Sequence, residues 1–176
     1  MNATPDGCHL RRATTADLPA VGALIRRVVP LMQAAGNFQW TLDYPNEPVF
    51  RQDILRNHLW VAVLNDTLAG VAALTTDQDP EYAQADWDAA EAALVTHRLA
   101  VDPAAQGRGV ARALLAQAET EARRQGLPTL RVDTNSENAA TQRLFPKLGY
   151  RFAGEIGLAF RPGLRFFCYE KRLTDT

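Results

Sequence analysis

The fold is decided by residues 99–111, which run Leu-Ala-Val-Asp-Pro-Ala-Ala-Gln-Gly-Arg-Gly-Val-Ala. An apolar strand ends at Val101, Asp102-Pro103 makes a turn, and a glycine-rich loop opens a long helix over 107–125. Backbone N–H groups at a helix start have no partner within the helix, and together with the helix dipole they attract an anion. Gly107 and Gly109 let a phosphate approach the backbone, because neither carries a Cβ. The stretch therefore predicts a phosphate-binding helix start.

Two common phosphate motifs do not fit this loop. A P-loop needs Gly-Lys-Ser/Thr, but Val110-Ala111 follow the glycine, and Arg112 replaces the third glycine of the dinucleotide fingerprint. The pattern present is Gln-x-x-Gly-x-Ala, at Gln106, Gly109 and Ala111. With the strand before it and the helix after it, this pattern resembles the acetyl-CoA motif of the GCN5-related N-acetyltransferase (GNAT) superfamily.

A second segment is similar to the later motif of the same superfamily. It covers 138–150 and runs Asn-Ala-Ala-Thr-Gln-Arg-Leu-Phe-Pro-Lys-Leu-Gly-Tyr. The resemblance extends over about 9–172 and is strongest over 97–152. It implies an N-acetyltransferase that moves an acetyl group from acetyl-CoA to a primary amine of a small molecule or peptide, by direct attack in a ternary complex. Two alternatives are a protein N-terminal or lysine acetyltransferase and a non-catalytic acyl-CoA-binding regulatory domain.

Hydrophobic periodicity and turn residues predict the order strand, two helices, three strands, helix, strand, helix, two strands. We expect these elements at 9–13, 18–30, 49–57, 59–64, 68–75, 92–101, 107–125, 130–134, 138–148, 150–156 and 166–171, with Pro30 interrupting or bending the first helix and Gly149 ending the last. The resemblance implies an α/β fold with a mixed, mostly antiparallel sheet of about seven strands and helices on both faces. The strand ending at Val101 should splay from the strand at 130–134 and hold CoA between them. We expect residues 1–176 to form one domain, with a core at about 9–172 and a loose tail at 1–7.

The resemblance also assigns the cofactor contacts. The pantetheine arm would pair with backbone groups of Leu99 and Val101, the pyrophosphate would lie on the N–H groups of 106–111, and Asn138 would hold the pantetheine side. The full set of expected acetyl-CoA contacts is Leu99, Ala100, Val101, Gln106, Gly107, Arg108, Gly109, Val110, Ala111, Asn138 and Phe145. No metal is expected.

Amine acylation needs a neutral amine, so a base must accept the proton of an ammonium group. His97 is the leading base, because strand parity places its side chain on the same face as those of Leu99 and Val101, and a branch of the superfamily has a histidine at this spot. The superfamily often has a tyrosine acid where this chain has Phe145, which cannot donate a proton. Tyr169 is the candidate acid in its place, with Tyr150 as an alternative.

Aromatic and charged residues mark candidate acceptor positions. Phe38, Trp40 and Tyr44 lie in the loop between the first two helices, where the superfamily builds acceptor pockets, and aromatic packing under the loop is the alternative. Four charged strand residues should either pair within the sheet or face a polar cleft: Arg98, Arg131, Asp133 and Glu170. Of these, Asp133 is taken as a substrate contact.

The segment 77–91 carries Trp87 and six acidic residues with no Lys or Arg, namely Asp77, Asp79, Glu81, Asp86, Asp88 and Glu91. It either attracts a cationic acceptor, with its C-terminal part at the cleft mouth, or is a solvated surface.

Bulk composition excludes several classes of function. The net charge of -1 argues against a broad nucleic-acid or anionic-membrane surface. No apolar run approaches the ~20 residues needed to cross a bilayer. The two cysteines, Cys8 and Cys168, have neither zinc-ligand nor disulfide-framework spacing. We expect a cytoplasmic enzyme and leave a homodimer open.

Overall fold

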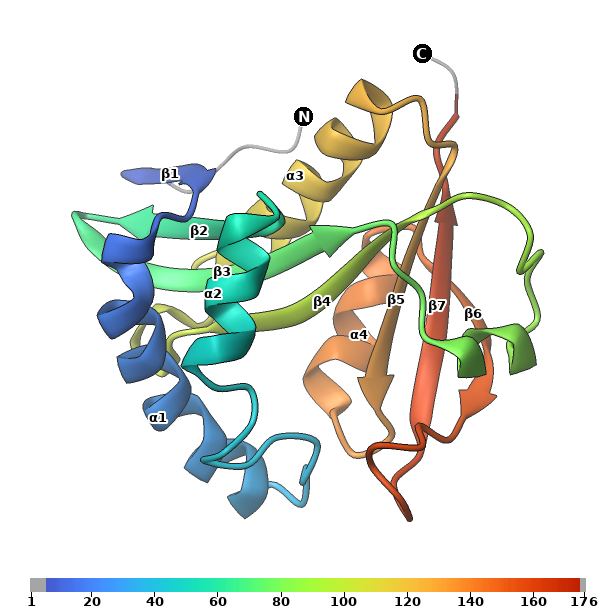
Figure 1. The fold of residues 1–176 in the computed structure, drawn as a ribbon, viewed down its shortest axis with the longest axis horizontal. Helices are drawn as coiled ribbons and strands as arrows, with labels where there is room; N and C mark the ends of the chain where they lie inside the picture. The colour runs from blue at the N-terminus through green and yellow to red at the C-terminus, as the bar shows by residue number, and fades with distance from the viewer. Residues whose placement is uncertain (1–5, 175–176) are drawn as a thin grey trace.

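The computed structural model describes residues 6–174 and contains a seven-stranded sheet in the order β1-β2-β3-β4-β5-β7-β6 (Figure 1). Every neighbouring pair is antiparallel except β4 and β5, which are parallel. The strands are β1 (Cys8–Arg12), β2 (Leu59–Leu64), β3 (Thr67–Thr75), β4 (Leu94–Val101), β5 (Thr129–Asn135), β6 (Arg151–Ile156) and β7 (Phe166–Arg172). The predicted mixed, mostly antiparallel sheet is confirmed.

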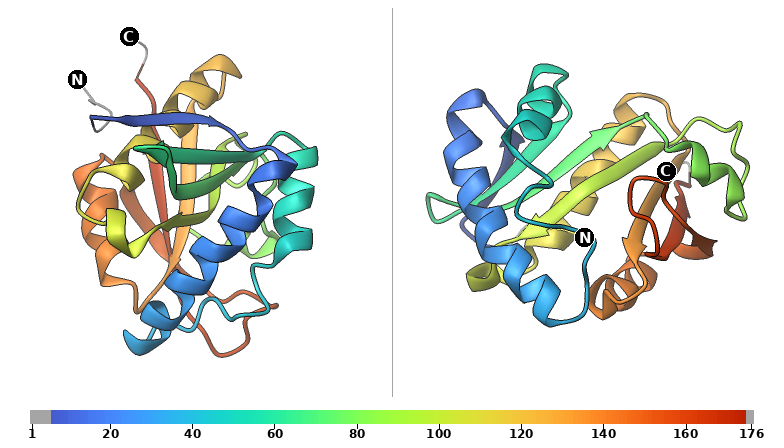
Figure 2. Two further views of the ribbon diagram at one scale, coloured as in Figure 1. Left: turned by 90° about the vertical axis from the view of Figure 1, so that its left-hand side faces the viewer. Right: turned by 60° about the horizontal axis from the view of Figure 1, so that its bottom comes forward.

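Helices cover both faces of this sheet (Figures 1 and 2). On one face α1 (Leu18–Ala34) and α2 (Glu47–Leu55) pack on alternate residues of β2 and β3, such as Val61 and Val71. On the other face α3 (Val110–Arg124) packs on the intervening residues, such as Ala62 and Ala72, and α4 (Ala139–Lys147) packs beside β6. The central strands are therefore apolar on both sides. None of the described helices is long and apolar enough to cross a membrane.

The two parallel strands separate along their length, as expected. They pair at three positions, from Leu94 opposite Leu130 to Thr96 opposite Val132, and the ladder ends there. Residues 97–101 of β4 and 133–135 of β5 continue apart, and the divergence is visible in Figure 1. The edge of β4 that faces β5 therefore has backbone N–H and C=O groups without a strand partner.

Several element boundaries differ from the predicted ones for local reasons. The third helix begins at Val110 and not at Gly107, because Gly107 and Gly109 have φ of 75° and 82°, which a right-handed helix excludes. Pro30 does not end α1, which continues to Ala34. Residues 1–5 of the tail expected at 1–7 lie outside the described residues, whereas the carbonyl of Gly7 accepts a hydrogen bond from Asn65 at 3.1 Å.

The acidic segment between β3 and β4 contains a short 3₁₀ helix, η2 (Pro80–Gln84), and is held by a buried arginine. Arg131 donates to the Gln78 side chain at 2.7 Å, to the Asp88 carbonyl at 2.7 Å and to Glu170 at 3.1 Å. Its guanidinium lies 4.7 Å from the ring centre of Trp87. Arg131 and Glu170 therefore pair within the sheet, which is one of the two roles that the sequence predicted for them.

Candidate active site

A cavity of about 640 Å³ opens where β4 and β5 diverge. It is bounded by the end of β4, the loop into α3, the end of β5 and the start of α4. The predicted site residues that line it are His97, Leu99, Ala100, Val101, Gln106, Gly107, Gly109, Val110, Ala111, Asp133, Asn138, Phe145, Trp40 and Tyr44. Most of the predicted set therefore meets in one cavity.

The start of α3 forms one end of this cavity. The first intrahelical bond runs from Ala113 N–H to the Gly109 carbonyl, so the N–H groups of 110–112 have no partner within the helix. The turn before them is fixed by Asp102, which accepts a hydrogen bond from Ala104 N–H at 2.9 Å and pairs with Arg27. The positive φ of Gly107 and Gly109 turns this loop around an open space suited to an anion.

The start of α4 forms a second wall. The Asn138 side chain caps α4 by accepting a hydrogen bond from Thr141 N–H at 3.3 Å. Phe145 lines the cavity but is 1% exposed, and it packs on Tyr150 and Tyr169 at ring-centre distances of 5.7 and 5.2 Å. The chain thus offers an apolar floor at Phe145 and no proton donor there.

Because β4 contains a bulge, the His97 side chain does not lie on the face that the sequence predicted. The register jumps from His97 opposite Ala73 to Ala100 opposite Val71, and Arg98 between them has φ of 53°. As a result Leu99 and Val101 pack towards α3, whereas His97 lies on the α1 and α2 face of the sheet. The parity argument was wrong, because it assumed an unbroken strand. His97 still reaches the cavity, since the cleft between the splayed strands is lined from both faces.

His97 belongs to a group of polar side chains on that face. Its Nε2 lies 3.2 Å from the Asp77 carbonyl, and its ring stacks on Tyr82 at 6.5 Å. The Tyr82 hydroxyl donates to Asp133 on β5. Burial raises the pKa of Asp133 above that of an ordinary carboxyl, and the nearby His97 opposes this rise without cancelling it. Burial, with Asp133 beside it, also raises the pKa of Tyr82.

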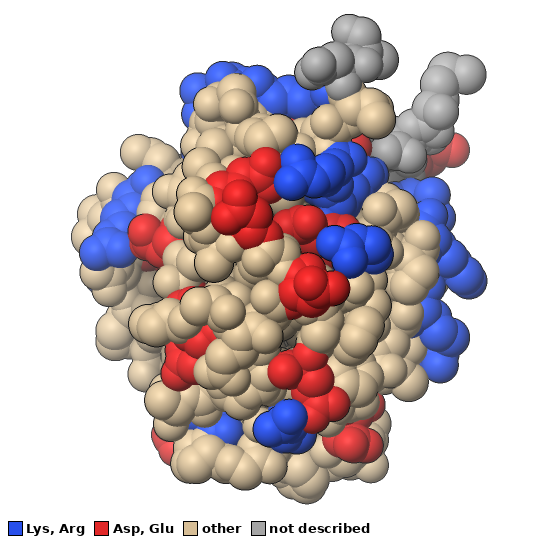
Figure 3. Space-filling model, turned by 90° about the vertical axis from the view of Figure 1, so that its right-hand side faces the viewer, with Lys and Arg blue, Asp and Glu red and all other residues tan. Residues whose placement is uncertain are grey.

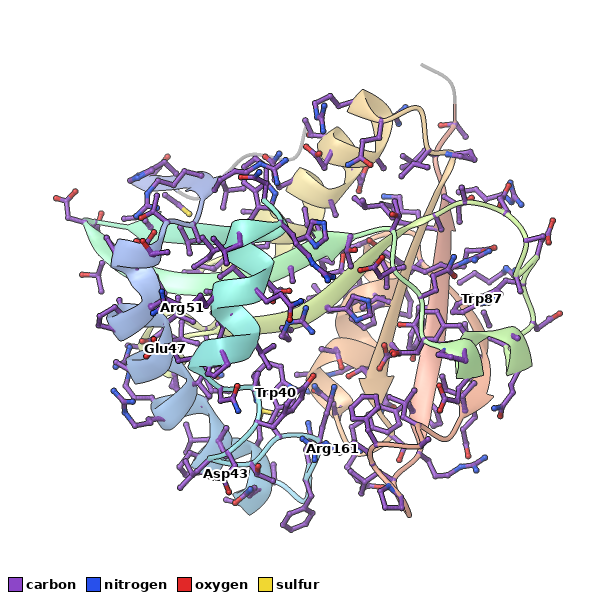
Figure 4. The ribbon with its side chains drawn as sticks, in the orientation of Figure 1. Trp40, Asp43, Glu47, Arg51, Trp87 and Arg161 are labelled. Carbon is purple, nitrogen blue, oxygen red and sulfur yellow. The ribbon has the colours of Figure 1, made fainter. Side chains whose placement is uncertain are left out.

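Four predicted site residues lie outside the cavity. Tyr169 is buried beside Phe145 and Phe152, which raises its pKa, so its placement does not support the acid role. Phe38 is 55% exposed. Arg108 is exposed, and Arg112 from the first turn of α3 lines the cavity instead. Trp87 packs on Tyr82 at 5.2 Å and donates to the Tyr82 carbonyl at 2.8 Å, near η2 and away from Trp40 (Figure 4).

The acidic segment contributes less to the site than its composition predicted. Asp77 and Asp79, at its N-terminal end, line cavities. Asp86 lies 4.0 Å from Arg151, and Glu91 pairs with Arg172 at 3.0 Å. Acidic and basic side chains are interspersed on this face of the molecule (Figure 3). The C-terminal part of the segment therefore packs against the β6 and β7 edge and not at the cleft mouth.

Three site residues come from the loop between β6 and β7, for which the sequence predicted no role. Leu158, Phe160 and Arg161 all line the cavity. Arg161 lies near the loop after α1 (Figure 4), with its guanidinium carbon 4.7 Å from the ring centre of Tyr44. The sequence Phe-Arg-Pro-Gly at 160–163 predicts a turn. It does not predict that this turn lies next to Tyr44.

The comparisons with known proteins agree with this geometry. The family model described as the acetyltransferase (GNAT) family matches residues 26–150. The chain belongs to the GNAT acetyltransferase family. A GNAT-family acetyltransferase from Streptococcus agalactiae is 28% identical, with a TM-score of 0.80 over 98% of this chain and 99% of that one.

Two further solved structures share this fold. An N-acetyltransferase from Staphylococcus aureus Mu50 is 25% identical, with a TM-score of 0.68 over 95% of this chain and 99% of that one. The putative acetyltransferase yncA from Salmonella typhimurium, solved with its cofactor acetyl-CoA, is 24% identical, with a TM-score of 0.67 over 97% and 96%. A comparison with curated protein sequences gave no significant match.

As a GNAT enzyme the protein is an acetyl-CoA-dependent acetyltransferase. The cavity fits such a donor, because it combines an anion-binding helix start with a free strand edge and an apolar floor. Among residues 6–174, no group of three or more His, Cys, Asp or Glu side chains is placed to hold a metal ion.

Proposed function

We propose that this GNAT enzyme is an N-acetyltransferase that acetylates a primary amine of a small molecule or peptide, by direct attack with both substrates bound. The observation that carries the proposal is that one cavity joins the start of α3 to His97 and Asp133. A donor held at one end and an amine held at the other would share this cavity without an acyl-enzyme step. Among the described residues that line this cavity there is no Cys or Ser side chain to act as a nucleophile.

The donor would be held mainly by backbone groups. The N–H groups of 110–112, which have no partner within the helix, would donate hydrogen bonds to the phosphates, with the Arg112 side chain adding positive charge. Unpaired backbone groups of Leu99 and Val101 would hold the pantetheine arm, with Asn138 on the opposite wall and Phe145 beneath. Bound in this way, acetyl-CoA supplies an activated acetyl thioester.

His97 would accept the proton that the amine loses. A carbonyl oxygen can only accept, so Nε2 of His97 donates to Asp77, and the neutral ring keeps its lone pair on Nδ1. That nitrogen is free to receive a proton, directly or through one water. Asp133, held by Tyr82, would stabilise the charged ring that results. We assign no acid to the leaving sulfur, because Phe145 cannot donate and Tyr169 lies outside the cavity.

The experiment is an acetyl-transfer assay that reads free thiol release with a panel of amines and peptides. We expect turnover with at least one small amine, and loss of turnover in His97→Ala with acetyl-CoA binding retained. Turnover with proteins alone would favour the protein acetyltransferase alternative. Tight acetyl-CoA binding without transfer to any amine or protein would favour the regulatory alternative.

A further inference from the structure

Arg161 is a cationic side chain in the cleft with an unsatisfied buried donor. Its Nε is buried and has no hydrogen-bond partner within the described part of the chain. Of the ion pairs formed among residues 6–174, none includes Arg161. A buried donor without an acceptor costs free energy, and more so on a charged group. A ligand that accepts from this guanidinium would remove that cost.

Two aromatic rings hold the guanidinium in place. Its carbon lies 4.7 Å from the ring centre of Tyr44 and 5.8 Å from that of Phe160, and these rings are 6.2 Å apart. Contact with an aromatic face orients the planar fork of an arginine without occupying its N–H groups. An oriented fork of N–H donors matches a carboxylate, which it can bind with two parallel hydrogen bonds.

Arg161 lies on the acceptor side of the cleft. Besides the main cavity it lines an adjoining cavity of about 600 Å³, together with Tyr44, Asp79, His97 and Phe160. No residue of the loop 105–112 lines that second cavity. A ligand group bound to Arg161 would therefore belong to the acceptor and not to the phosphates of CoA.

A carboxylate faces the same space. Asp79 lines both cavities and has no ion-pair partner among the described residues. The other carboxylates near the second cavity are neutralised: Asp53 pairs with Arg98 at 2.7 Å, and Asp77 lies 3.6 Å from Arg56. Among the described residues, the acceptor side thus presents one cation without an ion-pair partner, Arg161, and one carboxylate without one, Asp79.

We infer that the acceptor is a zwitterionic small molecule, an amine that carries a carboxylate, as a free amino acid does. Arg161 binds the carboxylate, and Asp79 attracts the ammonium group towards His97. This inference rests on the proposed function and narrows its substrate class. The inferred acceptor differs from a purely cationic one. A purely cationic acceptor would leave Arg161 without a partner and would place two positive charges side by side.

The test compares free amino acids with their C-terminal amides as acceptors, at saturating acetyl-CoA. We expect the wild-type enzyme to prefer the free acids, and Arg161→Gln to raise their KM about 10- to 100-fold, which is the loss of one charge-assisted contact. Arg161→Lys should recover part of this loss, and the KM for acetyl-CoA should stay unchanged in both variants. Arg165→Gln is the matched control, because Arg165 lies in the same loop, pairs with Glu155 and lines neither cavity.

Equal use of acids and amides, or equal effects of Arg161→Gln and Arg165→Gln, would overturn the inference while leaving the acetyltransferase activity intact. If the wild-type enzyme acetylates no amine, the proposed function fails, and binding still tests the site. In that case free amino acids should raise the melting temperature of the CoA-saturated wild-type protein but not of Arg161→Gln. Absence of that difference would overturn the inference.

Discussion

Asp53 on α2 and Arg98 on β4 form a two-pronged ion pair, with two N–O distances of 2.7 Å. Both side chains are largely buried, at 9% and 17% exposure. Arg98 is the bulge residue with φ of 53°, a conformation that costs a non-glycine residue free energy. The pair therefore holds the bulge closed against α2, and the bulge in turn places His97 on the face of Tyr82 and Asp133.

Removing Asp53 should destabilise the protein markedly. Asp53→Ala leaves a largely buried arginine without its partner, which typically costs about 3 kcal/mol. The control is Glu47→Ala on the same helix, where Glu47 and Arg51 form a pair that is 62% and 49% exposed (Figure 4). That change should cost no more than about 0.5 kcal/mol. Urea unfolding measures the loss of stability in both variants. Equal losses would show that the buried Asp53 pair stabilises the protein no more than the exposed Glu47 pair does.

Acetyl-CoA should stabilise the wild-type protein through the start of α3. At a concentration 100 times Kd, binding to the folded state adds about 2.7 kcal/mol, which corresponds to about 5–10 °C in melting temperature. Gly109→Glu should abolish this shift, because its carboxylate would lie beside the backbone N–H groups that donate to the phosphates and would repel them.

Gly126→Glu is the matched control for that experiment. Gly126 also has a positive φ, 69°, but it follows the far end of α3 and does not line the cavity. Both variants carry the same side chain and a similar backbone strain. The Gly126 variant should keep the shift in melting temperature. If Gly109→Glu also kept it, the phosphates of acetyl-CoA would not bind at the start of α3.

The sequence predicted the parts of the site that depend on backbone type and local order. The loop 102–111 has a left-handed backbone at two positions, and the glycines found there in the sequence indicate this conformation. The direction of His97 could not be derived, because a bulge is set by pairing with β3 and by Asp53, which lies 45 residues away from Arg98. The positions of Tyr169 and Arg161 relative to the cavity depend on how β6 and β7 pack. The local sequence does not determine that packing.

The ionisation of Glu121 should make the free energy of unfolding depend on pH below about pH 5. Hydrogen bonds, above all from Arg124, lower its pKa to about 2, and Arg12 contributes at 3.1 Å. A carboxyl whose pKa is lower in the folded state contributes stability above its unfolded pKa, near 4.3, and loses it as pH falls towards 2.

The wild-type protein should therefore be more stable than Glu121→Gln at pH 7, and the difference should shrink between pH 5 and 2. Urea unfolding at several pH values measures this difference. Glu137→Gln removes the same charge from an exposed site and should give no pH-dependent difference. A Glu121→Gln difference that stayed constant down to pH 2 would contradict the ionic origin of this contribution.

His97 carries the catalytic prediction. His97→Ala should lower kcat by ~100-fold or more, since it removes the group that accepts the amine proton, while the KM for acetyl-CoA changes little. The control is His9→Ala, because His9 is exposed on β1 and lines neither cavity. The pH dependence of kcat/KM provides the second readout, and one ionisation seen in the wild-type profile should disappear in His97→Ala. If the profile keeps its shape, His97 is not the base, and Asp133 or Asp79, which share its cavity, would have to accept the proton.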